Sequence, residues 1–227
     1  MAALLAAVLL VLTSVHTEQA ATPVPGTPPT KGTIFAVGDI VQRGLEPRAE
    51  AVGQLMKKML DETPGSIALL LGDNSNDAGS PEDFDRLDKT VWGELRSRYR
   101  ERVFAAIGNH EYWFDKTNPF HFFYWFNPGP IARGYDWFDL AGWRFFRLNS
   151  ELMKRSHDQL ERTRRREMLE WFEQELRRVP GSMCTGAYFH RPPFSSGNHA
   201  SPAWVMPLFH LSFKYGLDWY GTGHELT

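Results

Sequence analysis

Five short apolar runs in this chain each end near a residue that could bind a metal ion or take part in catalysis. The clearest is the stretch Phe104–Phe114, in which the run stops at a glycine and the polar residues Asn109, His110 and Glu111 follow. Alone, this group could be an ordinary turn, because glycine and asparagine favour turns and helix caps. The candidate ligands at the five run ends are Asp39, Asp73, Asn109, His190 and His224.

These five side chains offer carboxylate oxygen, amide oxygen and imidazole nitrogen, without a thiolate. That set suits borderline to hard cations such as Mn, Fe, Zn or Co better than a structural zinc finger. A carboxylate such as that of Asp73 can bridge two ions about 3.5 to 4 Å apart, the spacing used in two-metal hydrolysis of phosphate esters. We therefore interpret the five residues as a candidate metal site.

Each residue also has a simpler interpretation. Asp39 and Asp73 follow glycines and could be helix N-caps, and Asn109 could be a turn residue. His190 could be a buried histidine bonded to the backbone, and His224 could be an exposed residue near the end of the chain. Together these interpretations require five coincidences in order, so we favour the metal site.

The elements that would position these residues alternate along the chain. The apolar runs predict strands over Thr33–Val37, Ile67–Leu71, Val103–Ile107, Ala187–Phe189 and Leu217–Thr222. Helical periodicity predicts helices over Arg48–Leu60, Pro81–Arg100, Asp158–Val179 and Pro202–Tyr215. The alternation favours an α/β fold with a largely parallel sheet. If the five strand ends lie side by side at one edge, their polar residues meet there.

Three further segments carry expectations about the fold. Residues 133–150 are typical of an antiparallel hairpin that turns at Ala141–Gly142, which predicts a second sheet or an extension of the first. The aromatic stretch Phe120–Pro130 is expected to be a loop packed over the core, with His121 incidental to the chemistry. The single cysteine, Cys184, can form no internal disulfide and is expected to be buried.

Composition indicates a soluble globular protein. The chain has 227 residues, of which 42% are hydrophobic and 23% charged, and this suits one domain, which we place at residues 32–227. The formal net charge is −2 and the basic residues are spread out, so electrostatics do not favour nucleic-acid binding.

The N-terminal residues predict export. Residues 1–21 contain an apolar run of about the length of a signal-peptide core, although no positive charge precedes it. Residues 22–31 are rich in threonine and proline, which suits an extended linker. We expect a secreted or periplasmic protein with no membrane span after signal removal. The alternative is a disordered apolar leader or a wrongly chosen start codon.

Six motifs, taken in order, carry a resemblance to a known family. They are VGDI at residues 37–40, LLGDNSND at 70–77, IGNHEYW at 107–113, RLNSEL at 147–152, AYFHRPPFSSGNH at 187–199 and YGLDWYGTGHEL at 215–226. In this order and at these intervals the sequence resembles the calcineurin-like metallophosphoesterases, most closely their exported bacterial branch related to purple acid phosphatases. The resemblance covers nearly everything from Thr33 onward. It implies a β-sandwich of mixed sheets flanked by helices, in four layers α/β/β/α.

The resemblance implies a site for two divalent or trivalent metal ions (Fe, Mn or Zn). One ion would be held by Asp73, Asn109, His190 and His224. The other would take Asp39 and Asp73, a tyrosine or histidine early in the chain, and the second histidine of a terminal Gly-His-x-His motif.

The sequence departs from this pattern on the side of the second ion. Val41 stands where many relatives have histidine, Asn76 stands where a tyrosine is expected, and Leu226 replaces the last histidine. That ion therefore keeps two recognisable protein ligands and loses two, so a single bound ion is an alternative. The resemblance also leads us to expect further strands beyond Thr227, which would make this a truncated or degenerate member.

The resemblance implies hydrolysis of small phosphorylated substrates, phosphomonoesters first, by a metal-bound hydroxide. His110 would act as proton donor or transition-state stabiliser, with Glu111 holding its orientation. Arg191 and His199 are candidate phosphate contacts. Two alternatives stay open. One is a catalytically impaired relative with one metal and a binding or structural role, and the other is a phosphodiesterase acting on nucleotides or lipid head groups.

Overall fold

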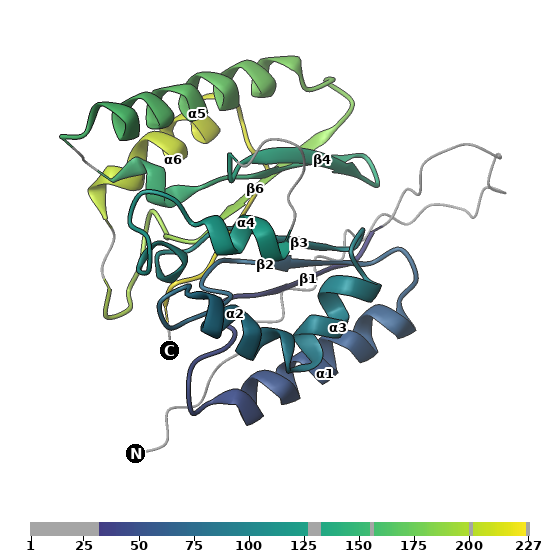
Figure 1. The fold of residues 1–227 in the computed structure, drawn as a ribbon. Helices are drawn as coiled ribbons and strands as arrows, with labels where there is room; N and C mark the ends of the chain where they lie inside the picture. The colour runs from purple at the N-terminus through teal and green to yellow at the C-terminus, as the bar shows by residue number, and fades with distance from the viewer. Residues whose placement is uncertain (1–31, 127–132, 155–156, 200–201, 226–227) are drawn as a thin grey trace, which may run out of the picture.

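The computed structural model describes residues 32–126, 133–154, 157–199 and 202–225, so the predicted signal peptide and linker lie outside the described residues. Two β-sheets pack against each other, and helices cover the outer face of each sheet (Figure 1). The predicted four-layer α/β/β/α architecture is confirmed. In the described part of the chain, no helix is long and apolar enough to cross a membrane.

The first sheet is parallel. Its strands, in spatial order, are β1 (Ile34–Val37), β2 (Ile67–Leu70) and β3 (Val103–Ala105). The helices on its outer face are α1 (Glu46–Glu62), α2 (Pro81–Asp88) and α3 (Val91–Arg98) (Figure 1). All four residues of β2 are buried, because helices cover one face of this strand and the second sheet covers the other.

The prediction of one helix over Pro81–Arg100 was wrong, because the chain forms α2 and α3 there. Thr90 lies between the two helices, and its hydroxyl accepts the backbone N–H of Trp92 as the N-cap of α3. The carboxylate of Glu50 on α1 accepts the backbone N–H of Val91 at 2.8 Å. The new helix start therefore has hydrogen-bond partners that a continuous helix would not need.

The second sheet has four strands. They are, in spatial order, β4 (Asp136–Leu140), β5 (Trp143–Arg147), β6 (Cys184–Phe189) and β7 (Trp219–Thr222). β4 and β5 form the predicted hairpin, which turns at Ala141 and Gly142 with φ of 49° and 82°. β6 and β7 run parallel to β5 in this sheet. The five predicted strand ends therefore lie on two packed sheets, three on the first and two on the second, rather than side by side in one.

Helices α5 (Gln159–Arg178) and α6 (Met206–Lys214) cover the second sheet (Figure 1). Between the two sheets, the rings of Phe104 and Phe138 stack with centroids 4.0 Å apart, and Tyr188 is fully buried. Short 3-10 helices occupy three loops: η1 (His110–Tyr112), η2 (Ser150–Met153) and η3 (Ala203–Val205). Packing between the sheets fixes the position of one set of strand ends relative to the other.

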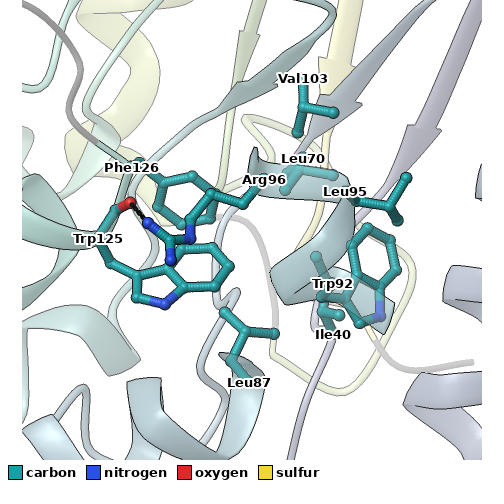
Figure 2. Close-up of a pocket in the computed structure, with 9 residues that line it drawn as sticks. All are labelled: Ile40, Leu70, Leu87, Trp92, Leu95, Arg96, Val103, Trp125 and Phe126. Atoms are coloured by element: carbon teal, nitrogen blue, oxygen red, sulfur yellow. Dashed lines mark hydrogen bonds between the residues drawn. The ribbon is translucent and has the colours of Figure 1, made fainter. Parts of the chain in front are cut away.

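The described part of the aromatic stretch forms a helix, α4 (Phe120–Phe126), where a loop was predicted, and its residues 127–130 lie outside the described residues. Its Phe122 and Trp125 are buried in the core, as expected of the packing. Figure 2 shows a pocket between α4, α2 and α3, where the Arg96 guanidinium lies 4.5 Å from the Trp125 ring and donates to the Trp125 carbonyl. Its lining is largely apolar and includes none of the candidate site residues.

Cys184 is exposed, so the prediction of a buried thiol was wrong. It is the first residue of β6, and the strand becomes buried only from the next residue onward. The buried part of β6 therefore begins at Thr185, and the thiol of Cys184 stays in contact with solvent.

Candidate metal centre

Loops that follow neighbouring strands stay hydrogen-bonded beyond the ends of the sheets. The Asp39 N–H donates to the Gly72 carbonyl at 3.0 Å, which joins the loops after β1 and β2. The Gly223 N–H donates to the His190 carbonyl at 3.0 Å, which joins the loops after β6 and β7. These bonds hold the candidate ligands at fixed positions along one edge of the sandwich.

Three of these residues have a left-handed backbone conformation. Their φ angles are 56° at Asp39, 50° at Asp73 and 75° at His224. Ala141 in the hairpin turn is the other non-glycine residue with positive φ in the described part of the chain. This conformation is uncommon for residues with a side chain, and strain of this kind concentrates at functional sites. The left-handed conformation of these strand-end residues therefore marks a candidate functional site, independently of their side-chain chemistry.

Two glycines beside the ligands leave no room for a side chain. A Cβ at Gly108 would lie 2.1 Å from Asp73 Oδ1, and one at Gly72 would lie 2.7 Å from His190 Cβ. The Gly-Asp and Gly-Asn sequences at the strand ends thus have a steric reason, since the backbone must approach the ligand side chains closely.

Four side chains meet at the atom His190 Nε2. We call these residues the ligand cluster: Asp73, Asn109, His190 and His224. His190 Nε2 is 3.0 Å from Asp73 Oδ2, 3.0 Å from His224 Nδ1 and 3.1 Å from Asn109 Oδ1. The ligand atoms of the carboxylate and the two imidazoles all lie within 4.8 Å of one another, and these residues are buried. Ligands about 2.1 Å from a shared ion have similar separations.

The hydrogen bonds around the ligand cluster suit metal binding. His190 Nδ1 lies 2.9 Å from the Leu71 carbonyl oxygen, so a proton on Nδ1 leaves the Nε2 lone pair facing the cluster. Asp73 Oδ1 accepts the His110 backbone N–H at 2.9 Å, while Asp73 Oδ2 faces the histidines. A donor set of one carboxylate, one amide and two imidazoles fits Mn, Fe or Zn.

The side of the site predicted for a second ion has fewer donors. Asp39 lies beside the ligand cluster, where its Oδ2 accepts the backbone N–H of His224 at 3.1 Å. Val41 is 2% exposed, and its apolar side chain belongs to the core cluster of the first sheet and its helices, so it offers no ligand. Asn76 is buried, and its backbone N–H donates to the Val41 carbonyl at 2.7 Å. Leu226 lies outside the described residues.

His110 lies at the edge of the ligand cluster. Its Nε2 is 3.7 Å from Asp73 Oδ2, and its Nδ1 contacts the backbone carbonyl of Asp77. Its ring packs on the Trp113 ring with centroids 3.7 Å apart. The side chain is 19% exposed, so a substrate can approach the ring from solvent.

Glu111 has partners that differ from the prediction. Its buried carboxylate accepts the backbone N–H groups of Asp73, Asn74, Ser75 and Gly108 at 2.6 to 3.2 Å. It therefore ties the loop after β2 to the loop after β3, whereas Asp77 and Trp113 orient the ring of His110. Burial, with the nearby Asp73 charge, raises the pKa of Glu111 to about 7, against the effect of the amides.

Arg191 lies at the rim of the ligand cluster. Its guanidinium contacts His224 Nε2, and its Nε donates to Glu151 Oε1 at 2.8 Å. His199 is half exposed, and its ring centroid is 4.5 Å from that of His224. Sequence reasoning missed Glu151, although the RLNSEL motif contains it. An acidic residue shortly after a strand end was the available signal.

Buried charges at the site shift one another's protonation. Burial opposes a charge on His190, but the adjacent Asp73 outweighs this and raises the pKa of His190 to about 9. Burial, with His190 and Arg191 nearby, lowers the pKa of His224 to about 3. Burial also raises the pKa of Asp39 to about 6. Without a metal, the positive charge that stabilises Asp73 is thus a second proton on His190, and a metal cation that displaces this proton from Nε2 would satisfy the same demand.

Comparison with known protein families shows the family to which the chain belongs. The model of the calcineurin-like phosphoesterase family matches residues 32–227, which is the whole predicted domain. The chain belongs to this family. A search of curated proteins found no match. Membership of this family supports metal-dependent hydrolysis of phosphoesters in general, and the ligand cluster supplies a possible binding place for the metal.

Proposed function

We propose that this calcineurin-like phosphoesterase hydrolyses phosphomonoesters at a metal held by Asp73, Asn109, His190 and His224. The observation that carries the proposal is the convergence of three donor atoms within 3.1 Å of His190 Nε2. A bound metal would supply positive charge for the phosphate oxygens and lower the pKa of a bound water towards about 7. We assign one tightly bound ion to the ligand cluster, since the Asp39 side offers fewer donors.

His110 exchanges a proton with the substrate. The Asp77 carbonyl beside Nδ1 favours a hydrogen on that atom, so Nε2 is the nitrogen left to face the substrate. Donation to the leaving oxygen uses the imidazolium form of His110, in which Nε2 also carries a hydrogen, and this leaves the neutral imidazole behind. Arg191 at the rim binds a non-bridging oxygen through its planar guanidinium. His199 is assigned a second contact with the phosphate, because its half-exposed ring lies beside His224.

Metal analysis combined with turnover of p-nitrophenyl phosphate tests the proposal. Protein loaded with Mn, Zn or Fe should hydrolyse this monoester, and Asp73→Asn should lose both metal and activity. Asp88→Asn is a matched control, because Asp88 pairs with Arg96 at the surface. Bound metal without turnover under any of the three ions would reject the phosphatase assignment. Faster turnover of bis-(p-nitrophenyl) phosphate would favour a phosphodiesterase.

A second candidate is an impaired relative that keeps one metal and serves as a binding or structural protein. Apolar Val41 and amide-bearing Asn76 at the second-ion side favour it. It predicts a stoichiometry of one ion per chain with no turnover, whereas the leading proposal predicts one tightly bound ion with turnover.

We also propose export and membership of the bacterial branch related to purple acid phosphatases. The support is the apolar run in residues 1–21 and the order of the six motifs. N-terminal sequencing of the secreted protein should find a start near Ala21, and a retained Met1 would reject signal cleavage. With Asn76 in place of the tyrosine, the iron-loaded protein should show no purple absorption band.

A further inference from the structure

We propose that Arg191 and Lys154, held by the buried carboxylate of Glu151, form an anion subsite that selects dianionic phosphomonoesters over monoanionic diesters. The proposal rests on the proposed function of the neighbouring ligand cluster and adds a basis for its substrate class.

One carboxylate holds both cations. Glu151 Oε1 accepts from Arg191 Nε at 2.8 Å, and Glu151 Oε2 forms an ion pair with Lys154 Nζ. The Glu151 side chain is 3% exposed, whereas that of Lys154 is 46% exposed. The buried acid therefore holds the Lys154 ammonium and one edge of the Arg191 guanidinium in place, and the half-exposed side chain of Lys154 can meet a ligand.

Trp204 lies against both cations. The Arg191 guanidinium carbon is 5.6 Å from the centroid of the Trp204 ring, and Lys154 Nζ is 5.8 Å from it. Cations gain attraction from an aromatic face at this distance. The indole thus provides a second surface that keeps Arg191 and Lys154 near each other.

The position of Arg191 connects this arrangement to the ligand cluster. Its guanidinium contacts His224, which belongs to the cluster. Its backbone N–H donates to Ser150 Oγ at 3.0 Å, so the loop after β6 is tied to η2, which carries Glu151. Glu151 is therefore a positioning residue, acting through Arg191 rather than on the substrate.

Charge decides which substrate this subsite favours. The three groups sum to one positive charge, with two cationic donors facing one buried acid. A phosphomonoester carries about two negative charges above pH 6, and a diester carries one. The positive charge of this subsite, next to a bound metal, therefore attracts the dianionic monoester more strongly than the monoanionic diester.

A similar arrangement elsewhere supplies the control. Glu173 on α5 pairs with Arg177 and Lys214, both at the surface. The described contacts of these three residues include none with the ligand cluster. Glu173→Gln therefore removes one acid between two cations without touching the site.

Titration of inorganic phosphate into metal-loaded protein tests the subsite directly. At pH 8, Lys154→Met should weaken phosphate binding about tenfold, since it loses one charge-assisted contact. Glu151→Gln should weaken it by a similar factor, because the loss of fixed positions for both cations outweighs the removal of one negative charge. Metal content should stay at the wild-type value in both. Glu173→Gln should bind phosphate as the wild type does.

Turnover separates selectivity from general damage. Lys154→Met should lower kcat/KM for p-nitrophenyl phosphate several-fold more than for bis-(p-nitrophenyl) phosphate. Equal losses on the two esters, or an unchanged phosphate affinity in Lys154→Met, would overturn the proposal. If Glu151→Gln fails to fold, Lys154→Met carries the test. If the loaded wild type hydrolyses neither ester, the proposed function fails, while the phosphate titration still decides whether the subsite exists.

Discussion

The two sides of the candidate metal centre share Asp73 but differ in their surroundings. On one side, polar atoms of Asp73, Asn109 and His224 lie within 3.1 Å of His190 Nε2. On the other side, Asp39 accepts a backbone N–H, and Val41 is packed into the core. The comparison teaches that the four residues predicted for one ion can meet in the fold while the side predicted for the other offers fewer donors.

The largest expected effect comes from the residue common to both sides. Asp73→Asn keeps the size of the side chain but removes the charge that faces His190, so metal affinity should fall by roughly 100-fold or more. Turnover should fall with it. Isothermal titration with Zn²⁺ measures the loss. Wild-type affinity in this variant would show that Asp73 is not a metal ligand and would contradict the comparison.

The second largest effect separates catalysis from metal binding. His110→Ala should lower kcat by about 100-fold, because proton transfer by a positioned side chain contributes at least that much. Metal content, measured by elemental analysis, should not change, since the His110 side chain lies outside the ligand cluster. An unchanged kcat would remove His110 from the mechanism, and lost metal would make it a ligand.

A smaller effect is expected on the poorer side. Asp39→Asn can still accept the backbone N–H of His224, so the tightly bound ion should stay in place and kcat should fall by less than about tenfold. Elemental analysis after dialysis and phosphatase assays measure both quantities. A loss as large as that of Asp73→Asn would show that the two sides are equivalent.

Restoring a histidine at the position of Val41 should not restore a second ion. The site is 2% exposed and lies in an apolar core, so Val41→His should lower the free energy of unfolding by about 1 to 3 kcal/mol without raising metal content. Urea unfolding measures the cost, and Val41→Ala gives the cost of lost packing alone. A second bound ion in Val41→His would contradict the account.

The candidate site was predictable where local sequence and topology agree. Gly-Asp and Gly-Asn after apolar runs marked the strand ends that carry Asp73 and Asn109, because buried strands leave ligands at their carboxyl ends. The hairpin was predictable from Ala141–Gly142. These signals are short in range, and they placed Asp73 and Asn109 directly after strands and the turn of the hairpin at Ala141–Gly142.

Long-range contacts were not predictable in the same way. The four backbone amides that bind Glu111 come from two loops, and no local pattern shows which carboxylate they select. The sheet to which β6 and β7 belong depends on packing between layers. The helix break at Thr90 depends on Glu50, a residue of another helix. Such contacts appear only when the chain is folded.

Equilibrium dialysis against Mn²⁺ or Zn²⁺, followed by elemental analysis, tests the central claim most directly. The account predicts one tightly bound ion per chain in the wild type and in Asp39→Asn, and none in Asp73→Asn. Two ions of equal affinity in the wild type, or no ion retained by the wild type, would contradict it.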